Sequence, residues 1–376
     1  MKEIKIEKTF SGGRLDRLLF KYLDAAPAGF IYKMLRKKNI VLNDKKAAGG
    51  EILKDGDVIK LYLADETIEK FKTGKAGSGT EESTGSGHER NAASAEEFRK
   101  FIIYEDENII AANKPAGLLS QKAKPQDISL NDMLLAYLGE TEVFTPGIAN
   151  RLDRNTAGIV LAGKNMLSGR LLGEAVKNRR FAKLYLALAQ GYIDEKVILE
   201  GYLVKDKKNN RAGVYGLNAY GAAQAGSGGF DSEEFPGGGR ENADINPEIP
   251  KGAQPVKLSV NPLIRHNNLT LLEAGLITGK SHQIRAQLSA FGRPLIGDYK
   301  YGNKKINEEF KRKYGLKGQF LCAYKIIFNN MEDGLSYLNG KTITAPLPEK
   351  FEEILKGENL CQPGLQEACG ALSLRK

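Results

Sequence analysis

One loop segment of the chain places a carboxylate where it could do chemistry. In Asn150-Arg-Leu-Asp-Arg-Asn-Thr-Ala-Gly, Asp153 stands between Arg151 and Arg154. Positive charges on both sides would keep an aspartate ionised at neutral pH, as a nucleophile or a general base must be. An isolated motif of this kind is more often an ordinary salt bridge in a loop. The segment therefore identifies a candidate and not yet a site.

A second segment, Thr278-Gly-Lys-Ser-His-Gln-Ile-Arg, has the composition of a helix start. We expect Ser281 to cap this helix and Gly292 to end it. His282 and Arg285 then lie one turn apart on the same face. A histidine here could act as an acid or a base, but a lone histidine more often makes a structural hydrogen bond.

Two further segments are less informative by themselves. Tyr185 lies in the apolar run Ala182-Lys-Leu-Tyr-Leu-Ala-Leu, where a half-buried core tyrosine is the commoner interpretation. Asn113-Lys-Pro-Ala-Gly predicts only a turn. No glycine-rich phosphate-binding motif follows a strand, so the sequence does not support a nucleotide cofactor.

Strand-like segments and helical segments alternate around these motifs. Several of the strand segments begin or end at glycine, and the connections mix hairpins with helices. This order predicts an α+β domain built on a mixed, mainly antiparallel sheet with flanking helices, and it does not fit a doubly wound fold. The expected strands are 102–104, 109–113, 158–162, 182–188 and 269–274.

Changes in composition divide the chain. Residues 73–97 are rich in glycine, serine and charge and predict a flexible linker. A glycine-rich stretch at 206–252 predicts a surface insertion, which could be mobile filler or a lid. We therefore expect a small N-terminal unit at 10–72, a larger domain at 98–355 and a tail at 356–376.

The N-terminal unit carries a cluster of basic side chains. Its apolar spacing predicts helices at about 14–23 and 29–38, and short strands follow near 40–45 and 55–63. Basic side chains at a helix end suit an RNA phosphate backbone, although a charged helix face is more often simply solvated. The residues that we expect to contact RNA are Arg14, Lys33, Arg36, Lys37 and Lys38.

The whole-chain composition narrows the class of protein. The formal net charge is +10 and the pI is about 9.2, which favours a polyanionic partner but also occurs in proteins that carry surplus lysine for solubility. Three cysteines and three histidines match neither a disulfide framework nor a metal site, so we expect no metal and a cytoplasmic, reducing environment. We expect no signal peptide or membrane span.

Taken together, the motifs resemble the RluA-type family of pseudouridine synthases. They occur in the family's order: Asn113-Lys-Pro-Ala-Gly, Arg151-Leu-Asp-Arg-Asn-Thr-Ala-Gly, Lys183-Leu-Tyr-Leu-Ala and His282-Gln-Ile-Arg, followed by Gly297-Asp-Tyr-Lys-Tyr-Gly and Ala345-Pro-Leu-Pro. The resemblance covers about 101–351 apart from the glycine-rich stretch. The N-terminal unit resembles the alpha-L RNA-binding module, which often precedes this domain.

The resemblance implies an isomerase that converts uridine in RNA to pseudouridine without a cofactor. Asp153 matches the essential aspartate, and Arg285 matches its basic partner. Tyr185 matches the tyrosine that packs on the base and is a candidate to take its C5 proton. Arg151 matches the arginine that helps to displace the base, and His282 and Gln283 belong to the same supporting block. The implied partner is RNA, ribosomal RNA before transfer RNA, and we expect a monomer.

The sequence departs from the family pattern at several positions. Asn150 replaces a histidine, Ala157 a serine, Lys280-Ser281 an Arg-Thr pair, and Cys322 lies in a variant Leu-His-Ala block. Two other functions stay open: a non-catalytic RNA-binding ribosome-assembly factor and a hydrolytic glycosylase. A glycosylase usually needs a second carboxylate or a positioned water beside the first. The step at Asp153, attack or proton removal, also stays open.

Overall fold

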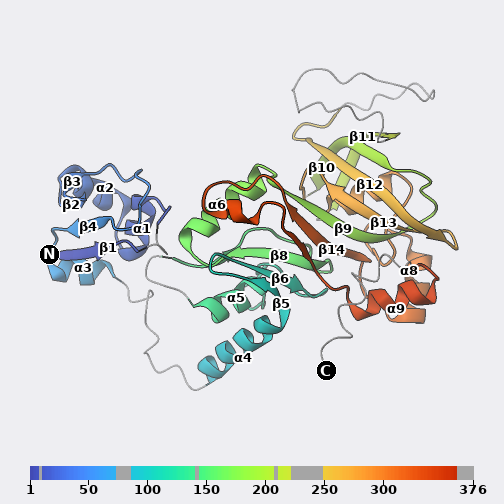
Figure 1. The fold of residues 1–376 in the computed structure, drawn as a ribbon, viewed down its shortest axis with the longest axis horizontal. Helices are drawn as coiled ribbons and strands as arrows, with labels where there is room; N and C mark the ends of the chain where they lie inside the picture. Colours follow the sequence, from blue (N-terminus) through green and yellow to red (C-terminus); the bar gives the residue numbers. More distant parts are fainter. Residues whose placement is uncertain (8–10, 73–85, 140–143, 207–210, 222–248, 362–376) are drawn as a thin grey trace.

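The chain folds around two β-sheets, one small and one large (Figure 1). The structure, a computed structural model, describes residues 1–7, 11–72, 86–139, 144–206, 211–221 and 249–361, with the backbone alone at 86–91. The small sheet has the strand order β1-β4-β2-β3. The large sheet runs β11-β10-β12-β13-β9-β14-β8-β6-β5, with β15 beside β14 and β7 beside β8.

The small sheet belongs to the N-terminal unit. Its two expected helices form. In the turn between β2 and β3, Asn43 and Asp44 both adopt the left-handed conformation that a two-residue hairpin requires. The strand β1 lies before residue 10, where the sequence analysis assigned no element, and it pairs with β4. The elements are β1 Lys2–Lys5, α1 Leu15–Tyr22, α2 Ala28–Arg36, β2 Ile40–Leu42, β3 Lys45–Lys46, β4 Val58–Leu61 and α3 Asp65–Phe71.

The large sheet is mixed and mainly antiparallel, and the α+β prediction is confirmed. Among its described strand pairs, only β8 and β14 run parallel. The five expected strands all form. The strands are β5 Ile102–Glu105, β6 Ile109–Lys114, β7 Gly147–Ile148, β8 Ala157–Gly163, β9 Phe181–Gln190, β10 Val197–Asp206, β11 Arg211–Gly221, β12 Gln254–His266, β13 Leu269–Leu276, β14 Leu321–Phe328 and β15 Thr342–Thr344.

Helices cover both faces of this sheet because its strands alternate apolar side chains between two cores. On β9, Tyr185 and Ala187 enter one core while Leu186 and Leu188 enter the other. The helices are α4 Ser86–Phe101, α5 Leu130–Leu138 and α7 Gln283–Ala290 on the first face, and α6 Met166–Lys177, α8 Lys304–Tyr314 and α9 Glu349–Gly357 on the second, with a 3₁₀ helix at Asp333–Leu338.

Two of the expected irregular segments contain regular structure. Residues 86–97, expected in a linker, belong to helix α4, whose Phe98 is buried against α5 and the sheet. Residues 211–221, expected in the insertion, form β11, which pairs with β10 along its length. The expectation of irregular structure was wrong in both places, because each segment is mostly glycine, polar and charged residues and has few apolar side chains to indicate that it packs. The remainder, 73–85, 207–210 and 222–248, lies outside the described residues.

The parallel contact between β8 and β14 depends on one glycine. Gly158 has φ = +112°, and a Cβ there would lie 2.3 Å from the Ala323 carbonyl oxygen. Only glycine allows this conformation and this approach. The glycine that closes the Arg151–Gly158 motif therefore brings the Asp153 loop against the centre of the sheet.

Among the described residues, no helix is long and apolar enough to cross a membrane.

Candidate active site

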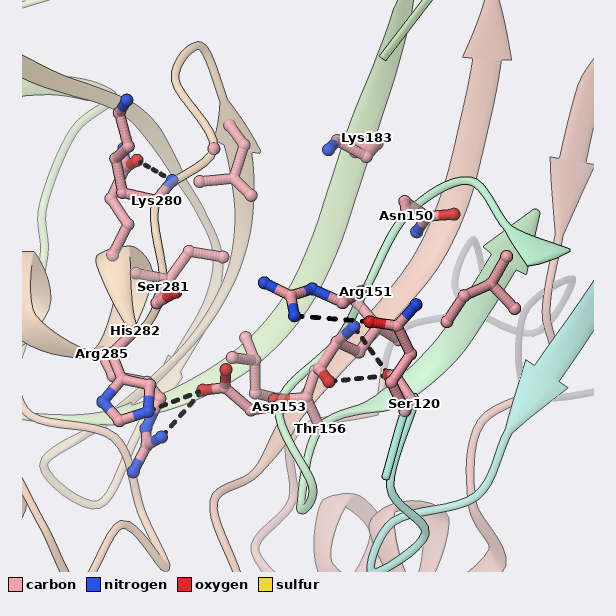
Figure 2. Close-up of a pocket in the computed structure, with 18 of the residues that line it drawn as sticks. Ser120, Asn150, Arg151, Asp153, Thr156, Lys183, Lys280, Ser281, His282 and Arg285 are labelled. Atoms are coloured by element: carbon pink, nitrogen blue, oxygen red, sulfur yellow. Dashed lines mark hydrogen bonds and ion pairs between the residues drawn. The ribbon is translucent and has the colours of Figure 1, made fainter. Parts of the chain in front are cut away.

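A cavity of about 730 Å³ opens above the centre of the large sheet. Its walls are the loop before β8, the strand β9 and the segment that leads into α7. Asp153, Tyr185 and Arg285, which lie far apart in the sequence, all line it. Figure 2 shows Asp153 and Arg285 facing each other across one end of the cavity. The family resemblance implied that Arg285 is the partner of Asp153, which requires the two side chains to be close.

Arg285 is the ion-pair partner of Asp153. Its Nη1 donates to Asp153 Oδ2 at 2.8 Å, and the Asp153 side chain is one-quarter exposed towards the cavity. The arginines adjacent to Asp153 in the sequence have other contacts. Arg154 Nε donates to the Gly117 carbonyl, and Arg151 makes one long contact of 3.5 Å with Gln121. The expectation that these two arginines hold the carboxylate was therefore wrong.

Arg285 is itself held by a second carboxylate, Asp298. The Nε and Nη2 of Arg285 donate to the two Asp298 oxygens at 2.6 and 2.9 Å, and the Asp298 side chain is fully buried. Burial alone would lower the pKa of Arg285, but Asp298 and then Asp153 raise it above its usual value. This fork fixes the plane of the guanidinium, so its remaining nitrogen points at Asp153.

Asp298 is a functional residue that the sequence analysis did not single out. It lies in Gly297-Asp-Tyr-Lys-Tyr-Gly, which contributed only to the family resemblance. Backbone N–H groups of Lys300 and Tyr301 also donate to Asp298, so its carboxylate accepts four hydrogen bonds in all. A buried acid in a glycine-bounded turn was the only signal available in the sequence.

His282 begins helix α7 in an unusual conformation. Its φ of +60° lies in the left-handed region, and it is His282 and not Ser281 that occupies the capping position. The prediction that Ser281 caps the helix was wrong. Gly292, with φ of +75°, follows the end of the helix as expected. A strained residue at the edge of the cavity is typical of a functional site.

The His282 ring is oriented by Tyr301. The Tyr301 hydroxyl lies 2.9 Å from His282 Nδ1 and accepts the Ala212 N–H at 2.7 Å. Burial lowers the pKa of His282, Arg285 and Lys300 reinforce the shift, and Asp153 opposes it. A neutral imidazole that accepts a hydrogen bond from the Tyr301 hydroxyl at Nδ1 carries its own hydrogen on Nε2, which lies 3.9 Å from Asp153 Oδ2.

Gln283 holds the turn at the start of α7 through three hydrogen bonds. It is buried, and its side chain accepts the Lys280 N–H and the Thr278 hydroxyl while donating to the Lys257 carbonyl. All three partners belong to the protein, so Gln283 holds the turn that presents His282. The side chain acts on the site through this turn.

The Asp153 loop is held by the segment that seemed to predict only a turn. Lys114 is fully buried, and its Nζ donates to three carbonyl oxygens, those of Pro115, Leu118 and Arg154. Burial lowers the pKa of Lys114 to about 7, against the opposing charge of Asp153. Three acceptors match the three hydrogens of an ammonium group. Ser120 completes the attachment through two hydrogen bonds with the Leu152 backbone.

Tyr185 supplies an apolar wall beside the acid. The side chain is almost fully buried on β9, between the core and the cavity. Burial raises the pKa of the Tyr185 phenol, and the charge of Asp153 raises it further. The phenol therefore stays protonated at neutral pH. This state favours packing against a base over accepting a proton from it.

Comparisons with known proteins identify the family of this chain. The family model described as RNA pseudouridylate synthase matches residues 108–290, which contain Asp153, Tyr185 and Arg285. "Ribosomal large subunit pseudouridine synthase C" of Rickettsia bellii (strain RML369-C) is 30% identical over 347 residues, which cover 91% of this chain and 96% of that protein. The chain belongs to the RNA pseudouridylate synthase family. It is therefore an isomerase that converts uridine in RNA to pseudouridine.

Other members of the family are similar over nearly the same length. "Ribosomal large subunit pseudouridine synthase C" of Vibrio parahaemolyticus serotype O3:K6 (strain RIMD 2210633) is 24% identical over 355 residues, which cover 94% of this chain and 95% of that protein. The solved structure "Human RNA Pseudouridylate Synthase Domain Containing 4" has a TM-score of 0.55 and 18% identity, and covers 72% of this chain and 98% of that one. This pseudouridine synthase therefore shares the family's fold.

Proposed function

We propose that this pseudouridine synthase modifies uridines of ribosomal RNA and that Asp153 is its catalytic carboxylate. Relatives that match more than nine-tenths of the chain carry the name ribosomal large subunit pseudouridine synthase, which supports the ribosomal target. One observation carries the catalytic assignment. Asp153 is the only carboxylate among the described residues that line the cavity, and it pairs there with a guanidinium that a second acid holds.

The reaction moves uracil without changing its oxidation state. The bond from uracil N1 to the ribose C1′ breaks, the base turns within the cavity, and C5 bonds to C1′. The proton lost from C5 is balanced by the proton gained at N1. One ionised carboxylate can serve this sequence by attack on the sugar or by removal of a proton. The Arg285 ion pair would hold the Asp153 side chain in position at the cavity.

The target uridine must leave its stack before it can reach Asp153, which costs a few kcal/mol. Arg151 is exposed and lines the cavity, two residues from Asp153 in the sequence. It would fill the position that the uridine leaves. Tyr185 lies on the wall and would pack against the detached uracil while it turns. A closely fitting wall keeps the base from escaping, so that isomerisation prevails over hydrolysis.

The N-terminal unit would add affinity for RNA. Lys33, Arg36, Lys37 and Lys38 are exposed at the end of α2, and no described residue forms an ion pair with any of them. Arg14 differs, since it donates to the buried Asp16 at 2.6 Å and supports the unit internally. We therefore assign the phosphate contacts chiefly to the end of α2.

The experiment is to map pseudouridines in the total RNA of a strain that lacks this protein. We expect one or more ribosomal RNA positions to remain uridine, and the wild-type gene but not Asp153→Asn to restore them. An unchanged map would refute the proposed function. Restoration by Asp153→Asn would favour the RNA-binding assembly factor, and free uracil released by purified enzyme would favour the glycosylase.

A further inference from the structure

The cavity carries a large excess of positive charge around its one acid. Among the described residues, six lysines and arginines line it and Asp153 is the one acid. Two of the six already have acidic partners, since Arg285 is bound by Asp153 and Asp298, and Lys122 lies 3.0 Å from Asp132. The remaining four are Arg151, Lys183, Lys205 and Lys280.

Lys183 stands apart from the other three cations by its burial. Arg151, Lys205 and Lys280 are exposed, so water solvates their charges, whereas Lys183 is only partly exposed. Within the described part of the chain, no hydrogen bond or ion pair satisfies its ammonium group. Burial lowers the pKa of Lys183, and no acidic group opposes this effect. Withdrawing a charge from water without a partner is costly, and an incoming anion would offset that cost.

The position of Lys183 indicates which anion it meets. It precedes Tyr185 by two residues on β9, so the two side chains leave the strand on one face about 7 Å apart. A Cβ on Gly279 would lie 3.8 Å from Lys183 Nζ, so the ammonium faces the turn before His282. In Figure 2, Lys183 and Lys280 lie at the end of the cavity away from the contact between Asp153 and Arg285.

We propose that Lys183 binds a backbone phosphate of the RNA strand beside the target uridine. This inference rests on the proposed function, because it assumes that the base lies between Tyr185 and Asp153. The ribose and its phosphate must then extend along the cavity, and Lys183 is the partly buried cation on that path. Lys280 on the opposite side adds a second, solvated charge. A phosphate contact also fixes the depth to which the strand enters.

The test compares Lys183→Met, Lys183→Arg and the control Lys356→Met, in the full-length protein. Lys356 is exposed on α9, which covers the other face of the sheet. The dissociation constant for ribosomal RNA isolated from the deletion strain is measured between 0.05 and 0.3 M KCl. Over this range each phosphate contact is expected to change the affinity by roughly half a decade. Pseudouridine formation is measured at saturating RNA.

We expect Lys183→Met to weaken binding about tenfold at low salt. The slope of log affinity against log salt should become shallower by about 0.7, the loss of one phosphate contact. Lys183→Arg should keep the slope, and Lys356→Met should match wild type in both measurements. Activity at saturating RNA should stay at the wild-type level in Lys356→Met, because Lys356 does not line the cavity.

An unchanged slope in Lys183→Met would overturn the phosphate contact, whether or not affinity falls. A weaker affinity with an unchanged slope, together with a lower melting temperature, would assign the lysine a purely structural role. The proposed function has its own readout, because wild-type enzyme must form pseudouridine in this RNA. Inactive wild type would overturn both proposals, whereas active wild type with an unaltered variant slope would overturn the phosphate contact alone.

Discussion

Arg285 contacts Asp153 at 2.8 Å although 132 residues separate them in the sequence. The guanidinium is shared between two acids whose surroundings differ. Asp298 is fully buried and accepts four hydrogen bonds, while Asp153 is partly exposed to the cavity. The buried acid thus holds the cation, and the cation holds the acid that faces the substrate. Each of the following predictions tests one part of this arrangement or of the RNA contacts around it.

Replacing Asp153 by Asn should abolish pseudouridine formation and leave RNA binding within about twofold of wild type. The amide keeps the shape of the side chain but lacks the charge that attack or proton removal requires. Nucleoside chromatography of treated RNA measures the first effect and a binding titration the second. Asp194→Asn, an exposed aspartate paired with Arg265, is the matched control and should stay active. Turnover by Asp153→Asn would contradict the assignment.

Replacing Asp298 by Asn should harm both stability and turnover. Removing one partner of a buried ion pair leaves an uncompensated charge and costs about 3 kcal/mol in the free energy of unfolding. Arg285 would also lose its fixed plane, and we expect kcat to fall about 100-fold because misplacement of a supporting group has effects of that size. Chemical denaturation and single-turnover kinetics measure the two. Unchanged kcat in folded variant protein would show that Asp298 does not position Arg285.

His282 should make the protein less stable in mild acid. Its pKa is lowered in the folded state, so the unfolded chain binds the extra proton first as the pH falls below about 6.5. The stability that the neutral imidazole contributes is therefore present above that pH and is lost progressively below it. His282→Asn, chosen because asparagine tolerates positive φ, should show a shallower decline between pH 7 and 5. The free energy of unfolding is measured by chemical denaturation at each pH. The same dependence on pH in the variant and the wild type would contradict this account.

Replacing Lys33, Arg36, Lys37 and Lys38 together by glutamine should weaken RNA binding mainly at low salt. Each lost phosphate contact should reduce the salt slope by about 0.7 to 0.9. Turnover at saturating RNA should remain near wild type, since none of these residues lines the cavity. The control replaces exposed Lys304, Lys305 and Arg312 on α8 in the same way. An identical salt slope in the quadruple variant and wild type would show that α2 does not contact RNA.

The sequence by itself determined many of the elements and several of the residues that could carry chemistry. Short, nearly continuous apolar runs predict β6, β8, β9 and β13, as is typical of strands that are buried on both faces of a sheet. The order of the motifs also determined the family. Asp153 was a candidate from its own segment, the resemblance added Tyr185 and Arg285, and the structure brings all three to one cavity.

Only the tertiary structure decided which charges meet. Asp153 lies between two arginines in the sequence, yet its partner comes from α7, and the acid that holds that partner comes from the turn after it. Likewise the sequence around Lys114 predicted only a turn, whereas in the structure its ammonium group donates to the Arg154 carbonyl. Sequence patterns report periodicity over a few residues, whereas ion pairs depend on where distant segments cross. Those crossings are set by packing of the whole sheet, which no local pattern contains.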